Sequence, residues 1–370
     1  MRLFTRAALG GLCGLTCLVA GTGPPGPPGV RSQADVLDLR GVGFQTPDCV
    51  VWDKDSDVYL VSNIHGHPQD KDDNGFISRV RPDGTVEALK WIDGASEGVT
   101  LHAPKGMAIT RDNLWVADID VMRRFERRSG RLLGEIAVKN AKYLDEVLPG
   151  WPDPNASPGV IDTALWRESK PGEFPPGRPR MVGLEPAPGE TGEVTFAKFV
   201  ATIFTEFMIV DSGLSTNETV LAQARRDYQS DQPCGQITGA TPFLMGLALV
   251  SWDRDWLYLL HVHDRGCGTQ AIRLPQAQLY DVLDVLYERH RLMEDQSGEW
   301  WGHWFVSSWA GRCVYHVRMR EPHRATVTEW VSGVRAPGKL GYDAKRNRVL
   351  IPLYLDNALL IRPGPGHFSE

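Results

Sequence analysis

The sequence has 370 residues, of which 42% are hydrophobic, and it carries a formal net charge of −6. This apolar content excludes a disordered chain, and the mixed charges exclude the basic surface that binding to nucleic acid requires. Glycine (38) and proline (26) are both frequent, which is typical of many short strands joined by tight turns.

The N-terminus is typical of a secretory signal. Arg2 and Arg6 precede an apolar run over residues 7–20, which is short for a membrane span. We therefore predict a signal peptide over residues 1–23, a flexible spacer over residues 24–35, and a secreted or periplasmic protein. A retained membrane anchor is the alternative. We expect no membrane contact beyond this segment, because no later run is apolar enough to span a bilayer.

Beyond the spacer, one pattern recurs along the chain: a short apolar strand that ends in small or polar residues. Its six copies begin at Asp57, Asn113, Glu206, Asp255, His303 and Asn347. A candidate for an inner strand precedes each copy, as in residues 48–53 and 105–109, and a further strand follows most of them. A period of roughly 40–50 residues with four strands per unit predicts propeller blades. We therefore predict an all-β fold, a six-bladed β-propeller over residues 36–370.

Three segments qualify this pattern. A gap of 93 residues separates the second copy from the third, and we interpret its Pro- and Gly-rich residues 140–194 as a long insertion between blades two and three. Residues 279–293 have apolar residues at helical spacing, which predicts a short helix within blade five. Residues 36–44 are expected to supply a strand that closes the ring with the C-terminal strands.

Four cysteines remain outside the predicted signal peptide: Cys49, Cys234, Cys267 and Cys313. An oxidising compartment permits disulfides, and four cysteines allow three pairings. We prefer Cys234 with Cys267, because these two bracket one repeat. The alternative is that all four are buried thiols. No Cys-x-x-Cys spacing occurs, which argues against a zinc site of that type.

Parts of the repeat resemble a known family. The stretches are Ser62-Asn-Ile-His-Gly with Asp70-Lys-Asp-Asp-Asn-Gly-Phe-Ile-Ser-Arg-Val80, Ala103-Pro-Lys-Gly-Met-Ala-Ile109, and Gly341-Tyr-Asp-Ala-Lys-Arg-Asn-Arg-Val-Leu-Ile-Pro352. They are similar to bacterial members of the regucalcin/gluconolactonase superfamily. The resemblance covers blades one, two, five and six, is thin in blades three and four, and is absent from the insertion.

The resemblance implies a six-bladed propeller with a divalent cation, often calcium, on its axis. It also implies hydrolysis of lactones or related esters, with a carboxylate as the base. The family holds its metal with a Glu from the first inner strand, an Asn from the third and an Asp from the fourth. Such oxygen ligands suit hard cations, and a bound cation can polarise a carbonyl group and acidify water.

Placed on this sequence, those metal positions are only partly acidic. Asp48 stands at the first, as a candidate metal ligand and catalytic carboxylate. Lys198 falls at the third position and Met245 at the fourth, and neither side chain can bind calcium. The second and sixth inner strands offer Lys105 and Lys339 near the axis. These four residues are candidates for binding a ligand, and an axis with several lysines argues against an intact metal site of the usual kind.

Three further features are ambiguous. Asp284 is either an axial catalytic acid of blade five or a solvated helix position. Residues 70–75 match the first half of a calcium-binding loop, but they also suit a polar β-turn. Trp300, Trp301, Trp304 and Trp309 cluster in blade five, where they either pack between blades or form a wall for a sugar or an aromatic ligand.

Two hypotheses follow. The first is a metal-assisted lactone or ester hydrolase with an altered axial site, in which Asp48 acts as a ligand. The second is a non-catalytic propeller that binds a small anionic molecule or a protein partner. The family's link to hydrolysis is an analogy, since propellers carry many unrelated functions.

Overall fold

The structure is a computed structural model. It describes residues 36–138, 141, 143–148, 159–162, 180–183, 237–243, 246–263, 266–285, 302–321 and 324–364. The chain divides into two units, Met1–Asp35 and Val36–Glu370, and every described residue belongs to the second. The predicted signal peptide and spacer therefore lie outside the described residues. Within the part described, no helix is long and apolar enough to cross a membrane.

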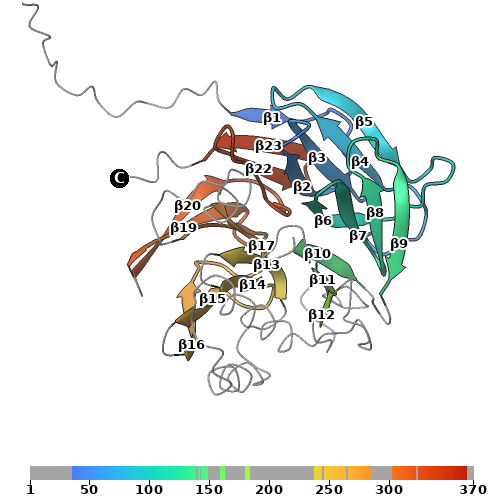
Figure 1. The fold of residues 1–370 in the computed structure, drawn as a ribbon. Coiled ribbons are helices and arrows are strands. Elements are labelled where there is room, and N and C mark those ends of the chain that lie inside the picture. The colour runs from blue at the N-terminus through green and yellow to red at the C-terminus, as the bar shows by residue number, and fades with distance from the viewer. Residues whose placement is uncertain are drawn as a thin grey trace, which may run out of the picture. The chain divides into compact units, whose positions relative to one another are not determined.

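Six antiparallel sheets make up the described part of the chain (Figure 1). Two four-stranded sheets come first: β2–β5 (Pro47–Asp53, Val58–Asn63, Phe76–Val80, Val86–Asp93) and β6–β9 (Pro104–Thr110, Asn113–Asp118, Val121–Glu126, Leu132–Ala137). A three-stranded sheet follows, β10–β12 (Leu144–Leu148, Gly159–Asp162, Arg180–Gly183).

The three remaining sheets each have four strands. They are β13–β16 (Ile237–Phe243, Gly246–Ser251, Trp256–His263, Gly266–Arg273), β17–β20 (Leu279–Asp284, His303–Ser308, Cys313–Glu321, Arg324–Ser332), and β21–β23 (Gly341–Asp343, Arg348–Leu353, Ala358–Pro363) completed by β1 (Leu37–Leu39).

Successive sheets contact one another through their first strands. Strand β2 contacts β6, β6 contacts β10, β10 contacts β13 and β13 contacts β17, while β2 also contacts β21 and β22. Phe305 of the β17–β20 sheet shares a core cluster with Val349 and Leu360 of the last sheet, so the circle of contacts closes. This arrangement confirms the predicted all-β propeller fold.

The predicted number of blades and the predicted insertion both need correction. The described residues contain five four-stranded blades rather than six, because the β10–β12 sheet has three strands. That sheet lies inside residues 140–194, which we expected to be an insertion between blades, so part of this segment pairs into a sheet. The third predicted repeat, at residues 206–212, lies outside the described residues.

Two predictions for the later blades need correction. Residues 255–261 form a strand as predicted, but it is β15, the third strand of its sheet, whereas the other described copies fall on second strands. Residues 279–284, which were expected to begin a helix, form the first strand β17. All six side chains of this strand are buried, and a strand buried on both faces shows no alternation of apolar and polar residues.

The predicted closure of the ring is confirmed. Strand β1 pairs antiparallel with β23, in the register Leu37 with Ile361 and Leu39 with Leu359. Leu39 is buried in a cluster that also holds Val50 of β2 and Leu350 of β22, so it joins both ends of the described unit. Cys49 and Cys313 are buried free thiols. The preferred Cys234–Cys267 disulfide stays a prediction, because Cys234 lies outside the described residues.

Candidate functional site

Charged and polar side chains gather where the first strands of the blades begin. Eight buried residues make up this group, which we call the axial cluster: Asp48, Lys105, Asp145, Glu146, Thr238, Tyr280, Asp281 and Lys339. They come from β2, β6, β10, β13, β17 and the residues just before β21. Burying four acids and two lysines is costly unless they pair with one another, so their contacts decide what the cluster can do.

Glycines allow the strands around the cluster to approach one another closely. A Cβ atom on Gly338 would lie 2.3 Å from the carbonyl oxygen of Asp48, and one on Gly106 would lie 2.3 Å from that of Asp145. Next to Gly338, the backbone N–H of Lys339 donates to the same Asp48 carbonyl at 2.6 Å. The two glycines therefore let backbones from neighbouring blades come together around the charged side chains.

Lys339 is the centre of the cluster. Its ammonium nitrogen lies 3.4 Å from Asp145 Oδ2 and 3.1 Å from Glu146 Oε2, and it donates to the carbonyl oxygen of Thr238 at 3.2 Å. It also lies 4.6 Å from the centroid of the Tyr280 ring. An ammonium group has three N–H donors, and three oxygens from two blades surround this one.

Asp48 is joined to the cluster through a tyrosine. Tyr280 donates its hydroxyl to Asp48 Oδ1 at 2.5 Å and also lies 3.4 Å from Asp145 Oδ1. Asp48 is fully buried, and its second oxygen, Oδ2, has no hydrogen-bond partner among the described residues. Burial, followed by the nearby Asp145, raises the pKa of Asp48 to about 7. A carboxyl group with such a pKa can take up or release a proton near neutral pH.

The other buried groups also depart from their usual ionisation. Burial raises the pKa of Glu146 well above its ordinary range, and it raises that of Asp281. Burial alone would lower the pKa of Lys339, but the four neighbouring carboxyl groups outweigh burial and hold it well above its ordinary value. Lys339 is therefore a permanent positive charge, and the nearby Glu146 and Asp281 bind protons more tightly than they do in water.

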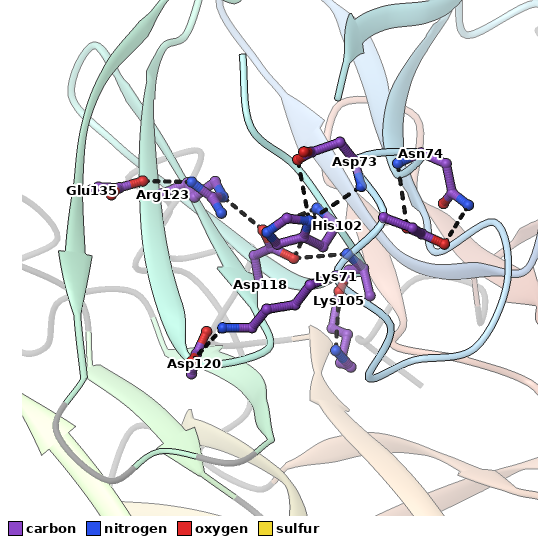
Figure 2. Close-up of polar contacts among 11 residues, drawn as sticks. Lys71, Asp73, Asn74, His102, Lys105, Asp118, Asp120, Arg123 and Glu135 are labelled. Atoms are coloured by element: carbon purple, nitrogen blue, oxygen red, sulfur yellow. Dashed lines mark hydrogen bonds and ion pairs between the residues drawn. The ribbon is translucent and has the colours of Figure 1, made fainter. Parts of the chain in front are cut away.

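Lys105 has different partners. Its ammonium donates to the carbonyl oxygen of Ala103 at 3.0 Å and lies 4.5 Å from the centroid of the Tyr143 ring. Burial lowers the pKa of Lys105, against the opposing effect of Asp118 and other carboxylates. Asp118 holds this segment in place, because it accepts hydrogen bonds from the backbone N–H of Ala103 at 2.7 Å and from Arg123 Nε at 2.6 Å (Figure 2).

Aromatic rings lie beside the axial cluster on the loops at the same end of the strands. The ring of Trp309, which follows β18, lies 5.2 Å from that of Tyr280 and 5.4 Å from that of Tyr354, between centroids. Trp252, which follows β14, lies 5.1 Å from Trp309. Trp252, Trp309 and Tyr354 are each partly exposed, whereas Tyr280 is buried. We call Trp252, Trp309 and Tyr354 the aromatic group.

The structure brings together three of the residues that the sequence singled out. Asp48, Lys105 and Lys339 all belong to the axial cluster. Lys198 and Met245 lie outside the described residues. Asp284 is a buried strand residue of β17 rather than a solvated helix position. The acid of this strand that belongs to the axial cluster is Asp281, whose carboxylate accepts from the backbone N–H of Leu340 at 2.7 Å.

Sequence reasoning missed the other five: Asp145, Glu146, Thr238, Tyr280 and Asp281. The first two lie in β10, inside the segment predicted to be an insertion, whereas Lys198 was the predicted axial residue of the third inner strand. The run Leu144-Asp-Glu-Val-Leu148 resembles Asp48-Cys-Val-Val, with acids leading into apolar residues, and this was the available signal. Of the four tryptophans that cluster in the sequence, Trp304 is fully buried and Trp309 belongs to the aromatic group. Trp300 and Trp301 lie outside the described residues.

The axial cluster does not fit the divalent cation that the resemblance implies. Lys339 carries a positive charge into the space between the carboxyl groups, where a metal would have to be held. Its N–O distances of 3.1 and 3.4 Å are those of ion pairs, and calcium needs oxygens at about 2.3–2.6 Å. Across the described ranges, no three acidic, histidine or cysteine side chains are arranged to hold a metal ion.

The expected half of a calcium loop forms a polar turn. Asp72 accepts from the side-chain amide of Asn74 at 2.6 Å, and Lys71 pairs with Asp120 at 2.7 Å (Figure 2). Asp70, Asp72 and Asp120 line an open cleft of about 570 Å³ beside this turn. The Lys71 ammonium lines the same cleft, so the carboxylates there already face a cation of the chain.

Comparison with known proteins supports the fold. The sequence matches no protein-family model, and no curated protein matches it. Among solved structures, it is similar to a luciferin-regenerating enzyme (TM-score 0.54, 8% identity, covering 90% of this chain and 96% of that one). It is also similar to a presumed gluconolactonase, with a TM-score of 0.53 and 12% identity over 89% of this chain and 92% of that one. A third similar structure is an auxiliary nutrient binding protein from Bacteroides ovatus, with a TM-score of 0.51 and 11% identity over 90% of this chain and 73% of that one. At these identities the likeness shows that the chain shares the β-propeller fold of the gluconolactonase-like structures.

Proposed function

We propose that this chain is an exported β-propeller that binds a small, ring-bearing ligand through the aromatic group, at the end of the axis where the axial cluster lies. The observation that carries the proposal is the group itself. Trp252, Trp309 and Tyr354 come from three different blades, and the ring centroid of Trp309 lies 5.1 Å from that of Trp252 and 5.4 Å from that of Tyr354. Aromatic faces gathered in this way suit the apolar face of a sugar ring or of an aromatic compound.

The contacts of the two lysines favour such a ligand over an anion. The three oxygens around the Lys339 ammonium match its three N–H donors, and the Lys105 ammonium donates to a backbone carbonyl and faces a tyrosine ring. An anion would have to displace these contacts and would meet four carboxyl groups. We therefore revise the expected ligand from an anionic molecule to a neutral one.

The comparisons are compatible with binding as well as with catalysis. One similar structure is described as a nutrient binding protein and another as a presumed gluconolactonase, so the same fold serves both kinds of protein. Export from residues 1–23 is a proposal that N-terminal sequencing of the secreted protein would test.

The binding proposal is tested by titrating the protein with neutral mono- and disaccharides and simple aromatic compounds, followed by calorimetry. We expect Trp309→Ala to weaken binding at least about tenfold, because it removes the ring that contacts both Trp252 and Tyr354. Trp91→Ala is the matched control, since Trp91 lies on the outer strand β5 and should leave affinity unchanged. The proposal would be contradicted if both variants lost the same amount of affinity, or if neither the saccharides nor the aromatic compounds bound to the wild type.

A second candidate function is hydrolysis of a lactone or ester without a metal. Asp48 favours it, because its pKa of about 7 and its unpartnered Oδ2 suit a general base that takes a proton from water. Tyr280 would hold the carboxyl group through Oδ1. We expect any lactone hydrolysis to survive a chelator and to fall at least about 100-fold in Asp48→Asn. Activity that a chelator abolishes would exclude this metal-free mechanism.

A further inference from the structure

The axial cluster holds more carboxyl groups than cations. Asp48, Asp145, Glu146 and Asp281 are all buried there, and Lys339 is the cation in direct contact with two of them. The pKa of Lys339 is held up by all four. Several buried acids around one permanent positive charge are also what a cation-binding site contains. Here the positive charge belongs to a side chain of the protein.

The chain fixes that cation in position through its backbone. The N–H of Lys339 donates to the carbonyl of Asp48 at 2.6 Å, and the carbonyl of Lys339 accepts from Val50 at 3.3 Å. These bonds form a parallel bridge between Lys339 and Cys49. Because the Cα atom is held by β2, the lysine side chain must extend across the cluster toward β10 and β13.

The oxygens around the Lys339 ammonium are the kind that hard cations prefer. Two are carboxylate oxygens and one is the backbone carbonyl of Thr238. A further carboxylate oxygen, Asp48 Oδ2, is fully buried and has no partner in the part of the chain that the structure describes. Shortening the distances from 3.1–3.4 Å to calcium-ligand values requires shifts of about 1 Å.

We infer that Lys339 is a built-in replacement for a divalent metal ion, so that the natural chain holds its axial carboxyl groups together without metal and a latent cation site appears when this ammonium is removed. The inference is independent of the ligand proposed above, since it concerns how the blades are joined and not what binds to the aromatic group.

The test is the thermal stability of Lys339→Met, which keeps an unbranched side chain as far as Cε and removes the ammonium group with its charge. Melting temperature is measured with EDTA, with calcium and with manganese, alongside calorimetric titration of each metal. We expect the melting temperature of the wild type to be the same in all three conditions. The variant should melt lower in EDTA and recover by at least about 3 °C at a metal concentration about 100 times its Kd.

Two further variants make the result specific. Lys105→Met removes the other buried ammonium of the cluster, whose partners are a carbonyl and a ring, and should stay insensitive to metal. Adding Glu146→Gln to Lys339→Met removes one carboxylate, which should restore folding and weaken metal binding at least tenfold. Two results would overturn the inference. One is a wild type whose melting temperature falls in EDTA. The other is a Lys339→Met chain that responds to neither calcium nor manganese, whether the metal is added to the folded protein or is present during refolding.

Discussion

Asp48 shows how much its surroundings determine the chemistry of a single residue. It occupies the position where the resemblance implies a metal ligand, yet its neighbours are a tyrosine hydroxyl from β17, Asp145 from β10 and lysines from two other blades. One of its oxygens is bonded to Tyr280 and the other has no partner among the described residues, so the group is suited to gain or lose a proton. While the Lys339 ammonium occupies the cluster, the Asp48 carboxyl group is therefore better suited to acid–base chemistry than to holding a metal.

The raised pKa of Asp48 predicts a pH dependence of folding. Its pKa rises from 3.8 in the unfolded chain to about 7 in the folded one, so between these values the folded state binds more protons. Stability must then fall as pH rises through this window. Relative to Asp48→Asn, the wild type should lose roughly 3 kcal/mol of unfolding free energy between pH 5 and pH 8.

Urea denaturation of both proteins at pH 5, 6, 7 and 8 checks this expectation. Asp38→Asn is the control, because it removes an exposed carboxylate of β1 that lies outside the axial cluster. If the difference between wild type and Asp48→Asn does not change with pH, Asp48 is already ionised in the folded protein at pH 5.

At the scale of the element, the sequence was informative where a strand has a distinctive local pattern. Strands β3, β7, β18 and β22 were located correctly, because each is a short apolar run that ends in small or polar residues. In the β13–β16 sheet, both β14 and β15 are apolar runs of this kind, so the pattern matched the third strand as well as the second. The predicted strand order of that blade was therefore displaced by one strand relative to the structure.

The same ambiguity explains why only three of the eight residues of the axial cluster were predicted. Asp48, Lys105 and Lys339 lie beside well-marked second strands, so their strands could be counted from sequence. The inner strand β17 is buried along its whole length, and its leucines and valine mimic helical spacing, which hid Tyr280 and Asp281. Strand β10 is five residues long within a segment rich in Pro and Gly, so Asp145 and Glu146 had no periodic context.

At the scale of the whole molecule, the residue contacts that join the two ends of the described unit are what close the ring. Tyr59 of β3 donates to Asp343 of β21 at 2.6 Å, and Arg346 forms ion pairs with Asp57 and Asp343. The backbone N–H of Thr46 donates to the Asn357 side chain at 2.7 Å. Long separations in sequence make such contacts expensive to form, and once formed they tie the first blade to the last.

Leu39 is the most direct test of this closure. Its side chain is 6% exposed and packs with residues of the first and last blades, whereas the neighbouring Asp38 points to solvent on the same three-residue strand. Leu39→Ala should lower the free energy of unfolding by about 2–4 kcal/mol, because it opens a cavity at the junction. Asp38→Ala should change it by less than about 0.5 kcal/mol.

Hydrogen exchange shows where the Leu39→Ala variant opens. Because β1 supplies the fourth strand of the last blade, the amide protons of β23 should exchange faster in this variant than those of β7, which lies in a blade remote from the closure. Uniform acceleration in both strands would mean that the ring opens as a whole rather than at this junction.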